Sequence, residues 1–402
     1  MGYQIQQRDI ELLFQKEKDV YVKIELLNNN FQTIDYMQGK LIDGSVTIDS
    51  NSDIRRQCNL TFTYKNKERL VSEVNRIWFD KLIRANIGYR HLRSRQIVFY
   101  PLGIFLFTTN SFTFDSVTRT VSCQLQDLMA NLNGMRNGLV VGALKTTIPL
   151  GNDIRTVIVD SVKLVKWLTK YYIEDICKTI PYDIKFSSKV TVYEIIKKLR
   201  DLYPCWECFF DIDGTFIYRK IPSKISDIVV LDENIINPLF ISENRNNDLT
   251  KVKNYTEIYG KDNIHGACME LSKSPTTEEK TRYITELNCE NIRYTINPNS
   301  PYCVDKIGLI PQQLSGGEFG KIPTLELVLD RAEYENWKST RMQDIVTLNC
   351  MAIPFLEVNQ KIQYTSRVTN KTEQYIITKI DIPLLSGTMT MELMKFYPLY
   401  PF

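Results

Sequence analysis

The sequence predicts a mainly β protein with an α+β insert: two antiparallel β-modules, at about 1–134 and 241–402, flank a small α/β unit at 135–240. Two observations support this division. In the first and last thirds of the chain, apolar residues alternate with polar ones, and a period of two is typical of half-buried strands. In the middle third, the spacing of the apolar residues changes to that of an amphipathic helix.

The first module begins with alternating segments. Val20, Val22 and Ile24 are separated by polar or aromatic residues and predict a strand. The stretch DGSVTIDSNSDIRRQCNLTFTY at 43–64 contains two alternating runs with a polar Ser-Asn-Ser-Asp turn between them, which predicts a hairpin. Further strands are expected near 105–108 and 120–125, followed by a helical turn that ends at Gly134.

The middle unit contains the clearest helix. TVYEIIKKLRDLYP at 191–204 has apolar residues at helical spacing, and Thr191 followed three residues later by Glu194 is a capping box. A weaker helix is predicted from one apolar face formed by Ile154, Ile158, Val162 and Val165. The sequence CWECFFDIDGTFIYRKIP then predicts a hairpin that turns at Asp213 and Gly214.

The last third predicts strands again, with a helix at about 325–338 after Thr324. Its final strand pair resembles an earlier one. In the earlier pair, Phe105–Thr108 is followed by TVSCQL, and in the final pair, Tyr375–Thr378 is followed by TMTMEL. The second strand of each pair fits the pattern Thr-x-(Ser/Thr)-x-(Gln/Glu)-Leu. Two explanations remain open: a chance similarity of two hairpins, or a duplicated β-module with the α/β unit between its copies.

Composition argues against several classes of protein. The 402 residues carry 50 basic and 47 acidic side chains, a balance that argues against a dedicated nucleic-acid-binding protein. The N-terminal segment lacks the apolar core of a secretory signal. The longest apolar run, IVFYPLGIFLF at 97–107, contains Pro101 and is too short to cross a bilayer. The nine cysteines have no framework spacing, which indicates reduced thiols in a protein made in a cytoplasm.

No motif makes a positive case for an enzyme. LSGGEFGK at 314–321 resembles the signature of ABC nucleotide-binding domains, but the phosphate-cradling loop that this signature must face is missing. A glycine-rich turn before a helix is the better interpretation. DIDGT at 211–215 lacks the third acidic position of a calcium loop, and the two histidines, His91 and His265, have no partner that indicates acid–base chemistry. We therefore expect no catalytic residues and no cofactor.

Cys205 and Cys208 have the spacing of a zinc or redox pair. A zinc site needs two further ligands at comparable spacing, which this sequence does not offer. A redox pair lies between a strand and the N-terminus of a helix, whereas these cysteines follow a predicted helix and open a predicted strand. We interpret them as structural cysteines and expect no bound metal.

The adjacent Arg55 and Arg56, at the start of a predicted strand, allow two interpretations. They can form a charged strand edge that prevents aggregation, or a contact to a neighbouring subunit. Adjacent side chains on a strand point to opposite faces. The second interpretation therefore places one arginine along its own module and the other on an acidic or carbonyl group across a subunit boundary. That arginine would be exposed in an isolated chain and buried in the assembly.

Several long stretches resemble one family. GKLIDGSVTIDSNSDIRRQCNLTF and LGIFLFTTNSFTFDSVTRTVSCQLQDLMANLNG are similar to the N-terminal module of tail-tip, or baseplate hub, proteins of long-tailed bacteriophages of Gram-positive bacteria and of phage-tail-like bacteriocins. TVYEIIKKLRDLYPCWECFFDIDGTFIY resembles the family's helix-and-hairpin middle unit. KVKNYTEIYGK, INPNSPYCVDKIG and the helix around Ala332 resemble its later part. The resemblance covers most of the chain but includes no active-site motif.

The resemblance implies a homotrimer at the distal end of the tail tube. Two tube-like β-modules per chain give six similar modules per trimer, which match a six-fold tube above to a three-fold spike or fibre below. The implied partners are further copies of the chain, the tail tube or distal-tail protein, a spike, fibre or tail lysin, and the tape-measure protein or DNA in the lumen, without membrane insertion. The implied location is the virion tail or bacteriocin particle, after synthesis in the bacterial cytoplasm.

Two alternatives stay open within the resemblance. One is the distal-tail ring protein, which is normally hexameric, and the other is a cell-wall-degrading tail enzyme. Many relatives carry a C-terminal peptidoglycan hydrolase or fibre extension, whereas this sequence ends at KFYPLYPF without one, so cell-wall cleavage is not expected. A duplicated module favours the hub over the ring.

Overall fold

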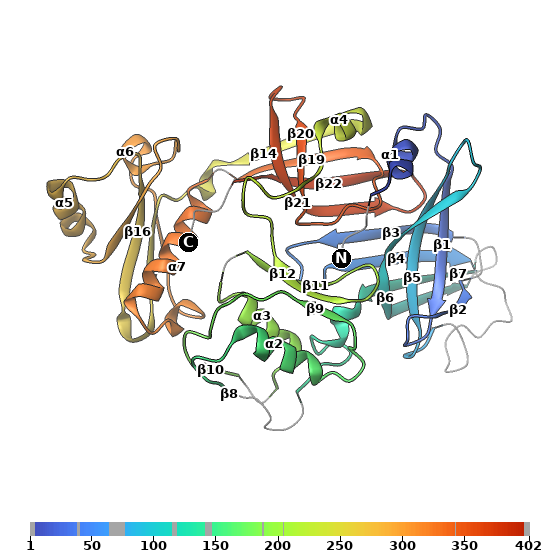
Figure 1. Ribbon diagram of the computed structural model, residues 1–402, viewed down its shortest axis with the longest axis horizontal. Helices are drawn as coiled ribbons and strands as arrows, with labels where there is room; N and C mark the ends of the chain where they lie inside the picture. The colour runs from blue at the N-terminus through green and yellow to red at the C-terminus, as the bar shows by residue number, and fades with distance from the viewer. Residues whose placement is uncertain are drawn as a thin grey trace. The chain divides into compact units, whose positions relative to one another are not determined.

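The computed structural model describes residues 5–37, 41–63, 77–114, 119–140, 147–186, 189–203, 205–341 and 343–397. The chain divides into two compact units (Figure 1). Among the described residues, the first unit contains those up to Arg245 and those from Val346 onward, and the second contains Asn246–Ile345. No helix of the described part is both long and apolar enough to cross a membrane.

A large sheet dominates the first unit. In its described part it has 13 strands, in the order β14-β19-β22-β21-β3-β4-β7-β6-β5-β1-β2, with β20 pairing β21 and β13 pairing β20. The strands are β1 (Val20–Leu27), β2 (Thr33–Tyr36), β3 (Leu41–Asp49), β4 (Arg56–Thr63), β5 (Leu82–Arg90), β6 (Ile97–Phe114), β7 (Arg119–Asp127), β13 (Val229–Leu231), β14 (Phe240–Asp248), β19 (Gln343–Met351), β20 (Lys361–Thr365), β21 (Thr372–Pro383) and β22 (Thr388–Lys395). The short helices α1 (Gln7–Leu13) and α4 (Glu233–Ile236) were not predicted.

The alternating sequence explains the hairpin of β3 and β4. The two strands pair antiparallel, with Ser45 opposite Asn59 and Val46 opposite Cys58. Val46 and Ile48 are buried on one strand, and Leu60 and Phe62 on the other, because a period of two turns every second side chain to the core. The predicted hairpin is confirmed.

Apart from β2, the described strands of the sheet form two sets of six with the same spatial order. The first set is β3-β4-β7-β6-β5-β1, and the second set is β14-β19-β22-β21-β20-β13. Numbered along the chain within each set, both orders read 2-3-6-5-4-1. One pairing differs, since β1 runs antiparallel to β5 whereas β13 runs parallel to β20. One hydrophobic cluster contains buried residues of both sets.

A matched irregularity supports a structural repeat. In the first set, the register of β6 against β7 shifts at Thr108, whose Oγ1 donates to the carbonyl oxygen of Gln124 at 2.8 Å. In the second set, the register of β21 against β22 shifts at Thr378, whose Oγ1 donates to the carbonyl oxygen of Glu392 at 3.1 Å. These residues occupy the same positions of the repeated sequence pattern. Because β-bulges are specific features of a fold, the match favours duplication over chance.

The α/β insert contains the predicted helices and hairpin. Its elements are β8 (Thr147–Ile148), α2 (Ile154–Lys163), β9 (Tyr171–Ile173), β10 (Ile184–Lys185), α3 (Val192–Arg200), β11 (Trp206–Phe210) and β12 (Phe216–Lys220). The Thr191 and Glu194 capping box starts α3. β11 and β12 pair antiparallel around a turn in which Gly214 has a φ of 78°, a conformation that glycine adopts without strain.

The second unit is a four-stranded mixed sheet with helices. The strand order is β17-β16-β15-β18, from β15 (Tyr255–Tyr259), β16 (His265–Leu271), β17 (Ile292–Ile296) and β18 (Pro311–Leu314). The helices are α5 (Thr277–Leu287), α6 (Val304–Ile307) and α7 (Leu325–Ser339). α7 buries Val328 and Ala332 against Ile258 and Cys268 of the sheet, which confirms the helix predicted at 325–338.

The observed grouping differs from the predicted module at 241–402. Residues 246–345 form a unit of their own, and the described residues from Val346 onward lie in the first unit. The physical reason is that β15 and β16 bury their apolar residues in two local clusters formed by their own helices and loops. One sequence signal for this α/β unit was overlooked: Thr276 and Glu279 form a capping box at the start of α5.

Candidate functional site

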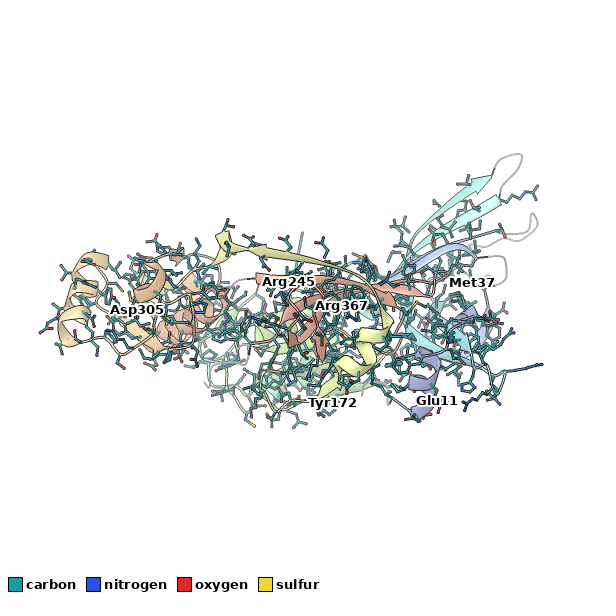
Figure 2. All side chains as sticks on the ribbon, turned by 90° about the horizontal axis from the view of Figure 1, so that it is seen from above. Glu11, Met37, Tyr172, Arg245, Asp305 and Arg367 are labelled. Atoms are coloured by element: carbon teal, nitrogen blue, oxygen red, sulfur yellow. The ribbon has the colours of Figure 1, made fainter. Side chains whose placement is uncertain are left out.

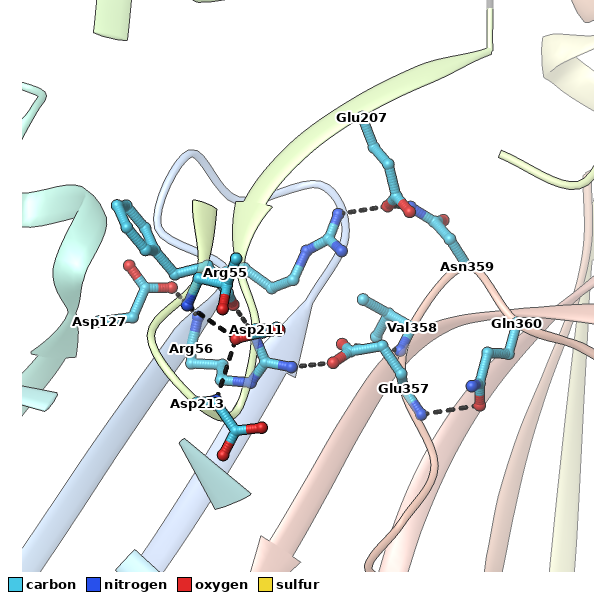
Figure 3. Close-up of polar contacts among 12 residues, drawn as sticks. Arg55, Arg56, Asp127, Glu207, Asp211, Asp213, Glu357, Val358, Asn359 and Gln360 are labelled. Carbon is cyan, nitrogen blue, oxygen red and sulfur yellow. Dashed lines mark hydrogen bonds and ion pairs between the residues drawn. The ribbon is translucent and has the colours of Figure 1, made fainter. Parts of the chain in front are cut away.

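Arg55 and Arg56, interpreted from the sequence as a charged strand edge or a subunit contact, lie at the start of β4, where three parts of the first unit meet (Figure 3). The backbone N–H of Arg56 donates to Oδ2 of Asp127 at 2.9 Å. The other carboxylate oxygen of Asp127 accepts from the N–H of Met129, also at 2.9 Å. Asp127 therefore ties the end of β7 to the first residue of β4.

Arg55 belongs to a buried ion network with the β11–β12 hairpin. Its Nη2 donates to Oε2 of Glu207 at 2.7 Å, and its guanidinium lies 3.9 Å from the ring centroid of Phe209. Oε1 of Glu207 accepts from Nε of Arg219 at 2.7 Å. Oε2 also accepts from Nδ2 of Asn359 at 2.6 Å. Both oxygens of this carboxylate thus have charged or amide donors, as a buried carboxylate requires.

Arg56 contacts the same hairpin, with its guanidinium 6.0 Å from the ring centroid of Phe209, and reaches one further segment. Its Nη1 donates to the carbonyl oxygen of Phe210, and its Nη2 forms an ion pair with Glu357. The side chain passes over Gly103 of β6, where an added Cβ would lie 2.8 Å from the arginine Cδ. The two arginines thus join β4 to the insert hairpin and to the 357–359 segment before β20.

Burial and neighbouring charges set the titration of this network. Burial, with Arg55 alongside, lowers the pKa of Arg56 to about 10. Burial alone would raise the pKa of Glu207, but Arg55, Arg219 and the hydrogen bond from Asn359 outweigh it and lower that pKa below its ordinary value. Asp127 shows the opposite result, because burial raises its pKa more than its backbone hydrogen bonds lower it.

The position of the pair differs from the sequence-based expectation. Arg55 is 5% exposed and Arg56 is 1% exposed in the single chain, whereas an inter-subunit arginine was expected to be exposed there. Acidic and carbonyl partners are present as expected, but the same chain provides them. The difference arises because Glu207 and Glu357 lie 152 and 301 residues from their partners in sequence, too far for a local pattern to reveal.

The surroundings of the network suit a structural joint. A cavity of about 40 Å³ lies beside Arg56 and is lined in part by Tyr100, Phe209 and Glu357. Small-molecule sites typically measure about 300–1,000 Å³, so this cavity has room only for water-sized molecules. The geometry therefore favours a role in holding β4, the insert and the second set of strands together.

The other candidates occupy ordinary structural positions. Cys205 and Cys208 lie at the start of β11, and burial raises the pKa of both, that of Cys205 to about 11, so they are thiols at neutral pH. In the part of the chain that the structure describes, no group of three or more His, Cys, Asp or Glu residues could hold a metal ion. LSGGEFGK runs from the last residue of β18 to a short 3-10 helix at Phe319–Lys321, with Gly316 and Gly317 at positive φ, which agrees with a glycine-rich turn before α7.

Changing Cys205 and Cys208 together to serine is expected to leave oligomer assembly unchanged. The free energy of unfolding should fall by about 1–3 kcal/mol, because a hydroxyl replaces the buried thiol of Cys208. The measurement is particle or oligomer mass together with thermal unfolding, and Cys177→Ser, at an exposed cysteine, is the matched control. Stoichiometric zinc in purified wild-type protein would contradict the structural interpretation.

Several solved structures with a similar fold are tail proteins. A 43 kDa tail protein of prophage MuSo2 from Shewanella oneidensis has a TM-score of 0.62 at 12% identity, over 93% of this chain and 98% of that chain. A tail protein from Neisseria meningitidis MC58 has a TM-score of 0.61 at 8% identity, over 93% and 96% of the two chains. This chain has the fold of a phage tail protein. The prophage tail protein gp18 from Listeria monocytogenes EGD-e is also similar, with a TM-score of 0.54 at 10% identity over 92% and 94%.

The tail-protein fold covers almost the whole chain, including the insert and the second unit. Its sources include Shewanella and Neisseria as well as Listeria, so the fold does not indicate a Gram-positive host. A family model described as a domain of unknown function (DUF5048) matches residues 299–400 and so extends over parts of both units. No curated protein sequence matches the chain.

Proposed function

We propose that this chain is a structural baseplate hub subunit at the tip of a phage or bacteriocin tail, with no catalytic activity of its own. The observation that carries the proposal is the repeat of six strands in the same spatial order, with a bulge at Thr108 in one set and at Thr378 in the other. A chain that contains two similar modules can present six of them as a trimer. Such a trimer matches a six-fold tube on one side and a three-fold partner on the other.

The proposed partners follow from this arrangement. The tail tube or a distal-tail protein lies above the ring of modules, and a spike, fibre or tail lysin lies below it. The tape-measure protein or DNA passes through the lumen. The buried network around Arg55 and Arg56 supports this role, because it fixes the insert against both sets of strands, as a force-bearing joint requires.

The alternative is a distal-tail ring protein, in which six chains each present one module. The duplicated strand order favours the hub, because six chains with two modules each would present twelve similar modules to a six-fold tube. The two functions therefore predict different copy numbers.

The expected result for purified particles is three copies of the chain at the tail tip. The measurement is quantitative mass spectrometry of intact particles, with the major tube protein as the internal standard, combined with antibody labelling in electron micrographs to find the labelled end. Six copies at the tail end would favour the ring protein instead. Absence of the chain from tail particles would reject both.

A further inference from the structure

The two sets of strands are joined inside one chain by a direct strand pair. β21 of the second set pairs antiparallel with β3 of the first set, from Lys379 opposite Asp49 to Pro383 opposite Ser45. Figure 1 shows the red and blue strands side by side. The N–H of Ser50 donates to the carbonyl oxygen of Thr378 at 2.9 Å, which extends the pairing by one residue. This joint is a model for how one module binds the next.

The repeat identifies the equivalent of β21 in the first set as β6. Alignment at the bulges places Thr109–Thr113 of β6 on Lys379–Pro383 of β21. In the described residues, four positions of this segment pair with β7 on one side: Thr109, Asn110, Ser111 and Thr113. On the side away from β7, no described strand pairs with these four residues. The β5 pairing ends at Leu106.

The side chains of Thr109–Thr113 are more exposed than the equivalent side chains of β21. Ile382, which lies opposite Val46 in the intrachain joint, is 1% exposed, whereas the equivalent Phe112 is 45% exposed. Asn110 is equivalent to the fully buried Ile380. The side-chain oxygen of Asn110 is buried without a hydrogen-bond partner in the described structure. Among the described residues, this segment is thus more exposed than the equivalent part of the intrachain joint.

The equivalent of β3 in the second set is β14. It is the last strand of the sheet order, with β19 as its neighbour in the described residues. Figure 2 shows it as the pale yellow strand near the label of Arg245. Its residues are exposed or half-buried along its whole length, and Ile241 is an exposed apolar side chain on it. Strand edges of this kind readily pair with another chain.

We propose that Thr109–Thr113 of one copy pair antiparallel with the outer edge of β14 in a second copy, and thereby repeat the β21–β3 joint between chains. The inference rests on the proposed trimer and names the surface that builds it. Three intrachain joints and three joints between copies then alternate around a closed ring of six modules. Backbone hydrogen bonds supply affinity in such strand addition, and burial of Phe112 adds to it.

The direction of the backbone groups allows a sharp test. Because Thr378 accepts from Ser50, alternation along an antiparallel pair directs the N–H of Ile380 to β3. The equivalent N–H of Asn110 therefore points away from β7. Proline at this position removes that donor, and edge strands tolerate proline when its N–H would face away from the paired strand. Asn110→Pro should fold normally and fail to pair with a second copy.

The experiment measures the mass of the full chain by analytical ultracentrifugation across a concentration series. Asn110→Pro and Phe112→Asp are the test variants, and Ile34→Asp is the matched control, because Ile34 lies on the other terminal strand, β2, and is 48% exposed. We expect a trimer for the wild type and the control. Each test variant should weaken assembly about 30-fold or more, the loss typical of an interface hot spot.

Circular dichroism and thermal unfolding check that each variant folds, and Phe112→Asp decides the result if Asn110→Pro unfolds. Test variants that form trimers as tightly as the wild type would overturn the proposed pairing and leave a trimeric hub standing. A wild-type chain that stays monomeric up to high concentration would also overturn the pairing. The location at the tail tip is decided separately by the copy number in particles.

Discussion

Replacing Glu207 by alanine is expected to lower the free energy of unfolding by about 3–5 kcal/mol, because it leaves a buried charge without its partner. Arg55 would lose its 2.7 Å ion pair, and Arg219 and Asn359 would lose their acceptor. Chemical denaturation followed by intrinsic fluorescence measures the change. Asp80→Ala is the matched control, since its ion pair with Lys81 is half exposed and should contribute at most about 1 kcal/mol.

The pH dependence provides a second check on Glu207. The native network lowers the pKa of this carboxyl, so the ionised form contributes stability above the ordinary glutamate pKa of about 4.3. That contribution is lost as the pH falls through the lowered native pKa. The difference in stability between the wild type and Glu207→Gln should therefore be largest near neutral pH and shrink in acid. A difference that is constant from pH 7 to pH 3 would contradict the ion network as its source.

Gly103→Ala is expected to cost about 2–5 kcal/mol, as the sum of backbone strain and overpacking. Gly103 has a φ of 144°, which side chains rarely adopt, and its new Cβ would lie 2.8 Å from Cδ of Arg56. Arg56 cannot move away easily, because its guanidinium is held by Phe210 and Glu357. Thermal unfolding at neutral pH, with denaturant titration, measures the loss.

The matched control separates the two contributions at Gly103. Gly151 also has a positive φ, of 84°, but nothing lies within 4 Å of the position its Cβ would take. Gly151→Ala should therefore cost only the backbone strain, about 1–2 kcal/mol. Equal losses for the two variants would show that close packing against Arg56 does not contribute.

Local sequence patterns were sufficient for several individual elements. The β3–β4 hairpin, the α3 capping box and the turn at Gly214 follow from residues within a few positions of one another. The repeated sequence pattern around Thr108 and Thr378 indicated a relation between two distant strand pairs. In the structure, each of these pairs contains the same bulge. The resemblance to tail proteins agrees with the fold.

Larger groupings were harder to predict. Apolar and polar residues alternate along the strands of the second unit much as they do in the large sheet. Periodicity alone therefore did not separate Asn246–Ile345 from the rest of the chain. Its capping box at Thr276 and Glu279 was a usable signal for a helix in this region. Whether residues 241–402 form one packed unit or belong to two depends on which apolar faces pack together. That packing is a property of the folded chain.

The sequence by itself determined the β3–β4 hairpin, the β11–β12 hairpin and the helices α2, α3 and α7, because these depend on spacing and on neighbouring residues. Only the tertiary structure decided the role of Arg55 and Arg56. The sequence pattern indicated that one arginine would bind an acidic or carbonyl group. The partners Glu207 and Glu357 come close to the arginines only because β4 packs against the insert and the 357–359 segment. Charges form buried pairs through spatial proximity, which the order of residues along a strand does not specify.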